Sequence, residues 1–317
     1  MLNYEISTIP FFLIDPKTGY LKDPVKSTLS TELLQMISDE NKCPPSKYLF
    51  IDFMAFARKV PVTKINENGG SLLVFGDLFQ YLLNMFISIA DRDVVIHIIF
   101  DTYKSHSVKD GTRKKRGKGL GMNVAIYSFE QRLPAELNKF WSSIYNKARF
   151  QQSFIQWVVE NFNGGQKIVL GGGSKENENE CLVISNKITR KMHSLETTLE
   201  EAYDKIMMHI EHEVNEGAKS IIIASNDTDI LVCLLYHSIG WMKKGLNQVW
   251  NVQGPKSNRK FYPLHTLVSV LGEEIVLQLP AAHSLTGCDT VSKVGTKYAA
   301  LKSLPSIYLK TFYHRTI

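Results

Sequence analysis

Short apolar runs that end in polar residues recur along this chain of 317 residues. Four of these runs are continuously apolar rather than alternating, which is typical of strands buried on both faces of a parallel sheet. They occupy residues 47–57, 94–101, 167–172 and 220–229. Three segments between them have apolar side chains at helical spacing, and these are residues 71–90, 138–162 and 195–216. The alternation predicts an α/β fold with a mostly parallel central sheet flanked by helices.

The two ends of the chain differ from this central part. Residues 1–45 contain scattered proline and glycine, and we expect an N-terminal leader of uncertain structure there. Residues 46–262 are expected to form the α/β core. From residue 263 to residue 317 the pattern is helical, with turn signals at Gly287 and Gly295. The sequence thus predicts one core followed by a helical C-terminal part.

Aspartates stand at or just beyond the ends of the predicted strands, and they are Asp52, Asp101, Asp227 and Asp229. In open parallel sheets, ligands bind outside the carboxyl ends of the strands. Any one of these residues is also explained as a helix cap. Several carboxylates at one rim, however, repel one another, and a divalent cation relieves that repulsion. Ligands that offer only oxygen atoms suit Mg²⁺ or Mn²⁺.

Five fragments of the chain, taken in order, resemble one known family. They are YLFIDF (48–53), VIHIIFDTYKSHSVKDGTRKKRG (95–117), LEEAYDKIMMH (199–209), SNDTDILVCLLYH (225–237) and HSLTGCDTVSKVGTKYA (283–299). The ordered set resembles the flap endonuclease/XPG-type nucleases of the PIN-like superfamily. It looks most like uncharacterised animal members of that type, some of them derived from mobile elements.

This resemblance implies a Rossmann-like PIN/flap-nuclease fold with a C-terminal helix–turn–helix-like module. It also implies cleavage of nucleic acid that depends on two Mg²⁺ or Mn²⁺ ions. By similarity, the metal-binding carboxylates are Asp52, Asp101, Glu201, Asp227, Asp229 and Asp289.

The chain departs from the family at one position of the segment 199–209. The family has a second acidic residue two positions after the first, and Tyr203 stands there instead. A carboxylate follows at Asp204, but one residue along a helix is a rotation of about 100°, so Asp204 is expected to point elsewhere. Glu200 lies three residues before Tyr203 on the same face and is the other candidate replacement. The number of bound metal ions therefore stays open.

The positive charge of the chain is concentrated in one segment. Residues 102–118 hold seven Lys or Arg and one Asp, while the other 300 residues balance 30 basic against 30 acidic side chains. Lys109, Arg113 and Arg116 have the spacing of one helix face. The resemblance implies a basic arch in which Lys109 and one of Arg113 or Arg116 contact the scissile phosphate, so we assign all three a catalytic role. Its other cations would bind nucleic acid, and they are Lys104, Lys114, Lys115 and Lys118. A nuclear localisation run or a solvated loop is the alternative.

A Gly-Cys-Asp turn precedes the last predicted helix. Backbone N–H groups at such a turn can hold a phosphate, and the resemblance implies a grip on the backbone of duplex DNA by Gly287, Gly295 and Lys297. The alternative is a tight turn in which Asp289 caps a helix.

Several other signals bear on compartment and ligands. Four cysteines lie far apart without CxxC spacing, and no secretory signal or apolar stretch of about 20 residues is present. We expect an intracellular protein without a membrane partner, and the basic run favours the nucleus. The glycine run at 171–175 lacks the order of a nucleotide-binding loop, so no small-molecule cofactor is expected. His209 and His212 are expected to face solvent, and His283 to be structural.

The sequence as a whole predicts a Mg²⁺-dependent structure-specific nuclease that hydrolyses phosphodiester bonds in DNA with single-strand/duplex junctions. DNA is favoured over RNA as the partner. One alternative is a nuclease-like protein that binds nucleic acid with weak or absent catalysis, which Tyr203 supports. The other is a PIN-type ribonuclease, against which the basic arch and the Gly-Cys-Asp turn speak.

Overall fold

The computed structural model describes residues 27–60, 72–89, 93–103, 123–175, 177–254 and 256–285. Part of the sequence-based prediction therefore lies outside the described residues. This applies to the candidate phosphate-binding cations Lys104, Lys109, Arg113, Lys114, Lys115, Arg116 and Lys118. It applies equally to Gly287, Asp289, Gly295 and Lys297.

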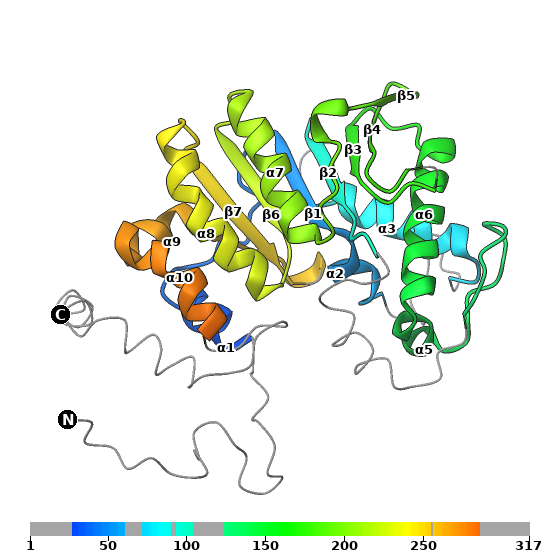
Figure 1. Ribbon diagram of the computed structural model, residues 1–317, viewed down its shortest axis with the longest axis horizontal. Helices are drawn as coiled ribbons and strands as arrows, with labels where there is room; N and C mark the ends of the chain where they lie inside the picture. The colour runs from blue at the N-terminus through cyan, green and yellow to red at the C-terminus, as the bar shows by residue number, and fades with distance from the viewer. Residues whose placement is uncertain are drawn as a thin grey trace, which may run out of the picture.

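An eight-stranded sheet forms the centre of the described structure, with the order β5-β4-β3-β2-β1-β6-β7-β8 (Figure 1). Its strands are β1 (Tyr48–Asp52), β2 (Val95–Ile99), β3 (Lys167–Gly171), β4 (Cys181–Ser185), β5 (Ile188–Lys191), β6 (Ser220–Ala224), β7 (Gln248–Gln253) and β8 (Lys260–Pro263). The central strands β3, β2, β1, β6 and β7 are parallel to one another. The strands β4, β5 and β8 join antiparallel at the edges. The predicted mostly parallel sheet is confirmed.

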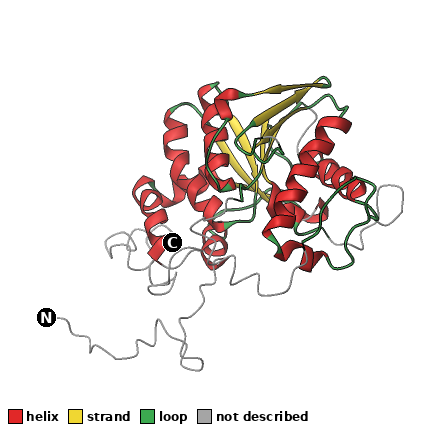
Figure 2. Cartoon of the chain, turned by 45° about the vertical axis from the view of Figure 1, so that its right-hand side comes forward, coloured by secondary structure: helices red, strands yellow, loops and turns green. Residues whose placement is uncertain are grey.

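Helices cover both faces of this sheet, as Figure 2 shows. They are α1 (Ser27–Leu34), α2 (Phe53–Ala57), α3 (Phe75–Ile87), α5 (Leu137–Ser142), α6 (Ile144–Asn161), α7 (Ala202–Asn215), α8 (Thr228–Lys243), α9 (Leu264–Leu271) and α10 (Glu273–Leu285). The helices α3 and α6 pack on one face, and α7, α8 and α9 pack on the other. None of these described helices is long and apolar enough to cross a membrane.

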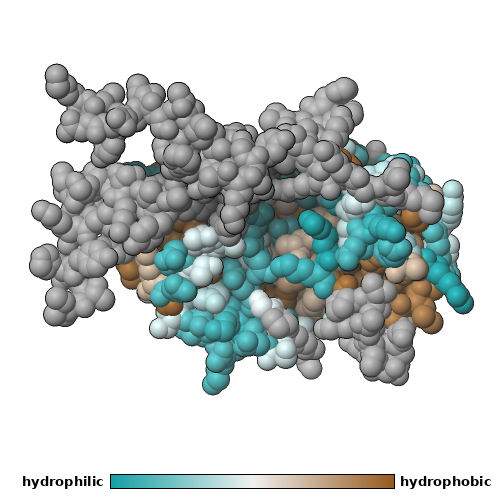
Figure 3. Space-filling model, turned by 90° about the horizontal axis from the view of Figure 1, so that it is seen from below, coloured by the Kyte–Doolittle hydropathy of each residue, from teal (hydrophilic) through white to brown (hydrophobic). Residues whose placement is uncertain are grey.

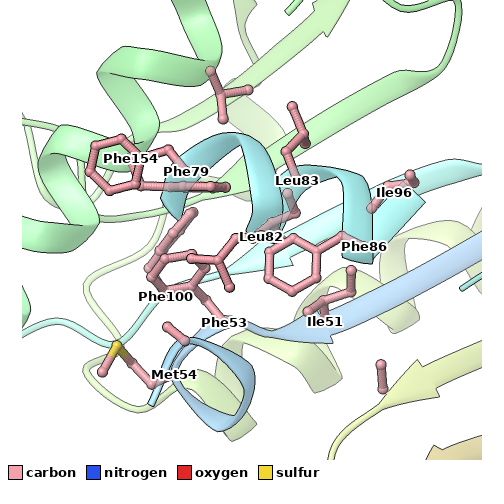
Figure 4. Packing of buried hydrophobic residues seen from close by; sticks show 14 of the residues in the cluster. Ile51, Phe53, Met54, Phe79, Leu82, Leu83, Phe86, Ile96, Phe100 and Phe154 are labelled. Atoms are coloured by element: carbon pink, nitrogen blue, oxygen red, sulfur yellow. The ribbon is translucent and has the colours of Figure 1, made fainter. Parts of the chain in front are cut away.

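Alternation along β1 divides its side chains between two hydrophobic clusters. Leu49 and Ile51 point toward α3 and α6, while Phe50 points toward α7. Just after the strand, the ring of Phe53 lies 4.7 Å from the ring of Phe100 and 4.7 Å from that of Phe154 (Figure 4). Burial of a large apolar side chain stabilises a fold by about 1.5–3 kcal/mol. This packing fixes the end of β1, where the first candidate aspartate stands.

Two of the strands end earlier than their apolar patterns predict. The pattern of residues 47–57 predicts one strand, yet β1 ends at Asp52 and α2 begins at Phe53. The run 220–229 likewise gives β6 only to Ala224, and Asp227 then caps α8. In both places an aspartate carboxylate accepts a backbone N–H of the following helix, which favours a turn over continued extension.

The segment predicted as a leader of uncertain structure contains a packed helix. Leu29 and Leu33 of α1 are buried in the cluster that also holds α7 and α8. At the other end, α9 and α10 confirm the predicted helical pattern after residue 263 as far as Leu285. The core of the described structure therefore draws on residues from both sides of the predicted 46–262 unit.

The expectation that His209 faces solvent is wrong. His209 is fully buried on the inner face of α7, and its Nδ1 lies 3.0 Å from Nδ1 of His97 on β2. His97 Nε2 in turn lies 3.2 Å from Oε1 of Glu213. A neutral His97 that donates its Nε2–H to the Glu213 carboxylate keeps a lone pair on Nδ1. The Nδ1–H of His209 then donates a hydrogen bond to this lone pair. The sequence pattern misses this pair because the partner comes from a distant strand.

Because these two histidines are buried, we expect the folded protein to lose stability in weak acid. Burial lowers the pKa of His97 and lowers that of His209 well below its usual range. Below about pH 6.5 the unfolded chain therefore takes up protons that the folded protein does not, so the free energy of unfolding falls as the pH falls. Each such histidine contributes at most about 1.4 kcal/mol per pH unit. Urea unfolding at pH values between about 7 and about 5 measures this slope.

Two glutamine substitutions provide the comparison. His209→Gln keeps a hydrogen-bonding side chain but cannot titrate, and we expect a shallower slope. His193→Gln makes the same substitution at an exposed histidine outside the buried pair and serves as the control. Equal slopes in all three proteins would contradict the assignment of a buried neutral His97–His209 pair.

Candidate metal centre

The order of the strands creates a switch point between β1 and β6. The chain passes from β1 outward to β2 and β3, and later returns to the other side of β1 to form β6 and then β7. Where neighbouring parallel strands lead off in opposite directions, a crevice opens at their carboxyl ends. The strands β1 and β6 lie side by side (Figure 1). Asp52 ends β1 and Asp227 follows β6, so both flank this point. The switch point of the sheet therefore coincides with the position of two of the predicted aspartates.

Three aspartates come to the same face of the sheet. Asp52 pairs with Ile99 of β2, and Asp101 follows Ile99 by two residues. On the other side, Ser225 follows the last paired residue of β6, and Asp227 stands two residues further. Because alternate residues of a strand share a face, these side chains all project toward α7 and α8. We call Asp52, Asp101, Asp227 and Asp229 the acidic rim.

Asp52 is the most buried member of the acidic rim, with 8% of its surface exposed. Its Oδ1 accepts the N–H of Ala55 at 3.3 Å, and its Oδ2 accepts the hydroxyl of Ser225 at 3.4 Å. Burial, together with the charges of Asp101 and Asp227, nevertheless raises the pKa of Asp52 to about 7. A helix cap stabilises a fold by about 1 kcal/mol. Ionisation of Asp52 in the folded protein costs about 1.4 kcal/mol for each unit by which its pKa is raised. Capping alone therefore does not account for a carboxylate at this position.

Asp101 is tied to the beginning of α7. Its Oδ1 accepts the N–H of Ala202 at 3.0 Å, and the hydroxyl of Tyr103 donates to Oδ2 at 3.3 Å. The preceding residues Glu200 and Glu201 stand at the start of this helix, and Glu201 is its N-cap residue. The fold therefore ties Asp101, two residues after β2, to the backbone at the start of α7, where Glu200 and Glu201 stand.

Asp227 and Asp229 lie at the first turn of α8. Asp227 caps this helix by accepting the N–H of Asp229 at 2.9 Å. The Oδ1 of Asp229 lies 2.6 Å from Nε2 of His283 on α10, and both side chains are largely buried. The sequence pattern predicts a structural role for His283 but not its contact with the acidic rim. The two residues are 54 positions apart, so only the folding back of α10 over α8 reveals the contact.

Tyr203, which stands where the resembling family has a second acidic residue, lies in the first turn of α7. Tyr203 packs against the hydrophobic cluster between α7 and α8, and burial followed by the charges of Asp204 and Glu201 raises its pKa. Asp204 also helps raise the pKa of Cys233 on α8 to about 11, after burial and together with Asp229 and Asp227. Asp204, in the first turn of α7, and the two aspartates of α8 thus act on the same thiol.

The donor atoms of the acidic rim fit a hard divalent cation by their chemistry. Its members offer only carboxylate oxygens, and mutual repulsion contributes to the raised pKa of Asp52. Within the described part of the chain, however, no three His, Cys, Asp or Glu side chains are grouped closely enough to hold one ion. Asp52, Asp101 and Asp227 each accept a hydrogen bond at the start of a separate helix. The rim thus has the composition of a metal centre, with its carboxylates held apart by three helix ends.

Ser225 is a further residue of this centre that the sequence analysis does not assign. Its hydroxyl oxygen accepts the N–H of Asp227 at 3.1 Å and donates to Asp52 at 3.4 Å. It therefore bridges the two strand ends at the switch point. A serine two residues before an aspartate at a strand end is a turn signal, and it could have suggested this role.

Comparison of the chain with known protein families and with curated proteins finds no match.

Replacement of Asp52 by asparagine is expected to stabilise the metal-free protein at about pH 8. Because the folded protein keeps the Asp52 proton up to a pKa of about 7, against an ordinary value of 3.8, ionisation costs stability as the pH rises between these values. The asparagine side chain would avoid this cost and could still accept the helix N–H. The free energy of unfolding in EDTA should rise by a few kcal/mol, at about 1.4 kcal/mol per pKa unit.

Asp77→Asn is the matched control. Asp77 accepts the N–H groups of Leu73 and Val74 at the start of α3, away from the acidic rim. Loss of its charge there should lower stability by about 0.5–1 kcal/mol. A stability decrease of the same size for Asp52→Asn would show that Asp52 is only a helix cap.

Proposed function

We propose that this protein is a metal-dependent nuclease that hydrolyses phosphodiester bonds in DNA with single-strand/duplex junctions, with Mg²⁺ or Mn²⁺ held by the acidic rim. One observation carries the proposal. The ends of β1, β2 and β6 deliver Asp52, Asp101 and Asp227 to the same face, on both sides of the switch point. The described fold, an α/β sheet with helices on both faces, agrees with the resemblance to flap endonuclease/XPG-type nucleases.

The chemistry requires few groups from the protein. Bound divalent metal lowers the pKa of a water molecule and stabilises the leaving oxygen of a phosphodiester. The acidic rim would hold that metal, together with Glu201, the N-cap residue of α7, and Asp204 in the first turn of that helix. Ser225 keeps Asp52 and Asp227 together, and the helix N–H groups orient the carboxylates. No covalent nucleophile from the protein is needed.

Both segments that the sequence analysis assigns to phosphate binding join the described structure beside the acidic rim. Tyr103 donates to Asp101, and the basic segment continues from it. His283 contacts Asp229, and the Gly-Cys-Asp turn begins four residues later in the sequence. Figure 3 views the molecule from the side on which the strands end, and the described surface there includes a band of hydrophilic residues. Cations that neutralise DNA phosphates and carboxylates that bind metal are thus neighbours along the chain.

The alternative is a nucleic-acid-binding protein of the same fold that has lost catalysis. Tyr203 favours it, because a partly buried tyrosine stands where the family has a carboxylate. Asp204 favours activity, because it supplies a carboxylate in the first turn of α7 whose charge acts on Cys233 together with those of Asp229 and Asp227. The basic segment fits both proposals and also fits a nuclear location.

Cleavage of flap, hairpin and single-stranded DNA in Mg²⁺ or Mn²⁺ tests the proposal, with an RNA strand of the same sequence for comparison. We expect cleavage of the junction substrates that EDTA abolishes. Asp52→Asn and Asp227→Asn should each lower the rate at least about 100-fold, because even indirect support of a metal ligand is worth about 10–100-fold. Glu160→Gln on the exposed side of α6, where Glu160 is bonded to Gln156, should cleave at the unaltered rate.

Two results would decide against the nuclease. Cleavage that persists in both aspartate variants would exclude the acidic rim as its centre. Binding of DNA without cleavage in either metal, and without heat of Mn²⁺ binding by calorimetry, would identify the protein as the inactive alternative.

A further inference from the structure

Lys205 is fully buried on α7, the helix whose start is hydrogen-bonded to Asp101. No other lysine or arginine of the described residues is buried. Burial of an ammonium group costs several kcal/mol unless hydrogen bonds and charges compensate it. An apolar residue at this inward-facing position would pack α7 against the sheet at lower cost, so a lysine here calls for a role beyond packing.

The amine of Lys205 holds the turn that contains Asp101. Its Nζ donates to the carbonyl oxygen of Phe100 at 2.8 Å and to the hydroxyl of Thr102 at 2.7 Å. Phe100 and Thr102 are the neighbours of Asp101 on either side. The Lys205 side chain therefore binds the backbone of Phe100, just before Asp101, and the side chain of Thr102, just after it.

The same turn is bound to the beginning of α7 by two more hydrogen bonds. The N–H of Thr102 donates to the carbonyl of Glu200 at 2.7 Å, and the N–H of Ala202 donates to Asp101 at 3.0 Å. Lys205 lies one helical turn after Glu201, whose carbonyl accepts the Lys205 N–H at 3.3 Å. Asp101 on the β2 side and Glu201 on α7 are thus fixed relative to each other through Lys205.

The glycine run after β3 makes room for this arrangement. Gly172 has a φ of +88°, and a Cβ there would lie 2.7 Å from Nζ of Lys205. A Cβ at Gly171 would lie 2.7 Å from Nε2 of His209. The two glycines therefore leave space for the buried polar side chains of α7. This packing accounts for the glycine run at 171–175, which lacks the order of a nucleotide-binding loop.

We propose that Lys205 is a positioning residue of the candidate metal centre, which fixes the turn carrying Asp101 relative to Glu201 at the start of α7. The inference rests on the proposed function and deepens it. Lys205 touches neither substrate nor metal in this role. It acts by holding the turn 100–102 against the start of α7.

Calorimetric titration with Mn²⁺ tests this role without relying on cleavage. Thr102→Val removes the hydroxyl that Lys205 binds, and Lys205→Met removes both hydrogen bonds while keeping an unbranched side chain. We expect each to weaken Mn²⁺ binding by about 10–100-fold, as for other residues that support metal ligands. Thr102→Ser keeps the hydroxyl and should bind Mn²⁺ as the unaltered protein does. Thermal unfolding of each variant shows that it is folded at the titration temperature.

The possible results separate this inference from the proposed function. Absence of Mn²⁺ binding by the unaltered protein overturns both. Binding by the unaltered protein that is equally tight in Thr102→Val overturns the role of Lys205 and leaves the proposed function standing. If Lys205→Met does not fold, the pair Thr102→Val and Thr102→Ser decides the question. Weaker binding in Thr102→Val with restoration in Thr102→Ser supports the inference.

Discussion

The parallel pairing of β1 with β2 on one side and with β6 on the other is the constraint on which the rest of the site depends. Parallel strands end at the same edge of a sheet, so whatever follows each strand is brought together there. In this protein Asp52 ends β1, and Asp101 and Asp227 follow the neighbouring strands by two or three residues. Their repulsion and the burial of Asp52 oppose ionisation, and a fold selected for stability alone would place uncharged residues at this edge.

The central part of the fold follows from the sequence because its strands are buried on both faces. Continuous apolar runs indicate β1, β2, β3 and β6, and the aspartates at their ends indicate the candidate site. The edge strands lack this signal: all four residues of β5 are exposed, and its position depends on pairing with β4. The turn from β1 into α2 is also missed, since an apolar pattern does not tell a buried strand from a short buried helix.

The contacts that refine the site could not be predicted from the sequence because they join distant residues. Lys205 binds Phe100 across 105 positions, and His209 meets His97 across 112. Lys205, His209 and Glu213 stand four residues apart on α7 and form a buried polar stripe along its inner face. Amphipathic patterning assigns such residues to solvent. Only the packing of α7 against β1 and β2 shows that His209 and Glu213 bind His97, and that Lys205 binds the turn around Asp101.

The claim that the acidic rim is built for a divalent cation is tested most directly by the ionisation of Asp52. The carboxyl carbon resonance of Asp52 can be followed by NMR as a function of pH, with and without saturating Mg²⁺. The account predicts a pKa of about 7 for Asp52 in the metal-free protein and a pKa several units lower with Mg²⁺, because the cation offsets both burial and repulsion. The same pKa in both titrations would contradict it.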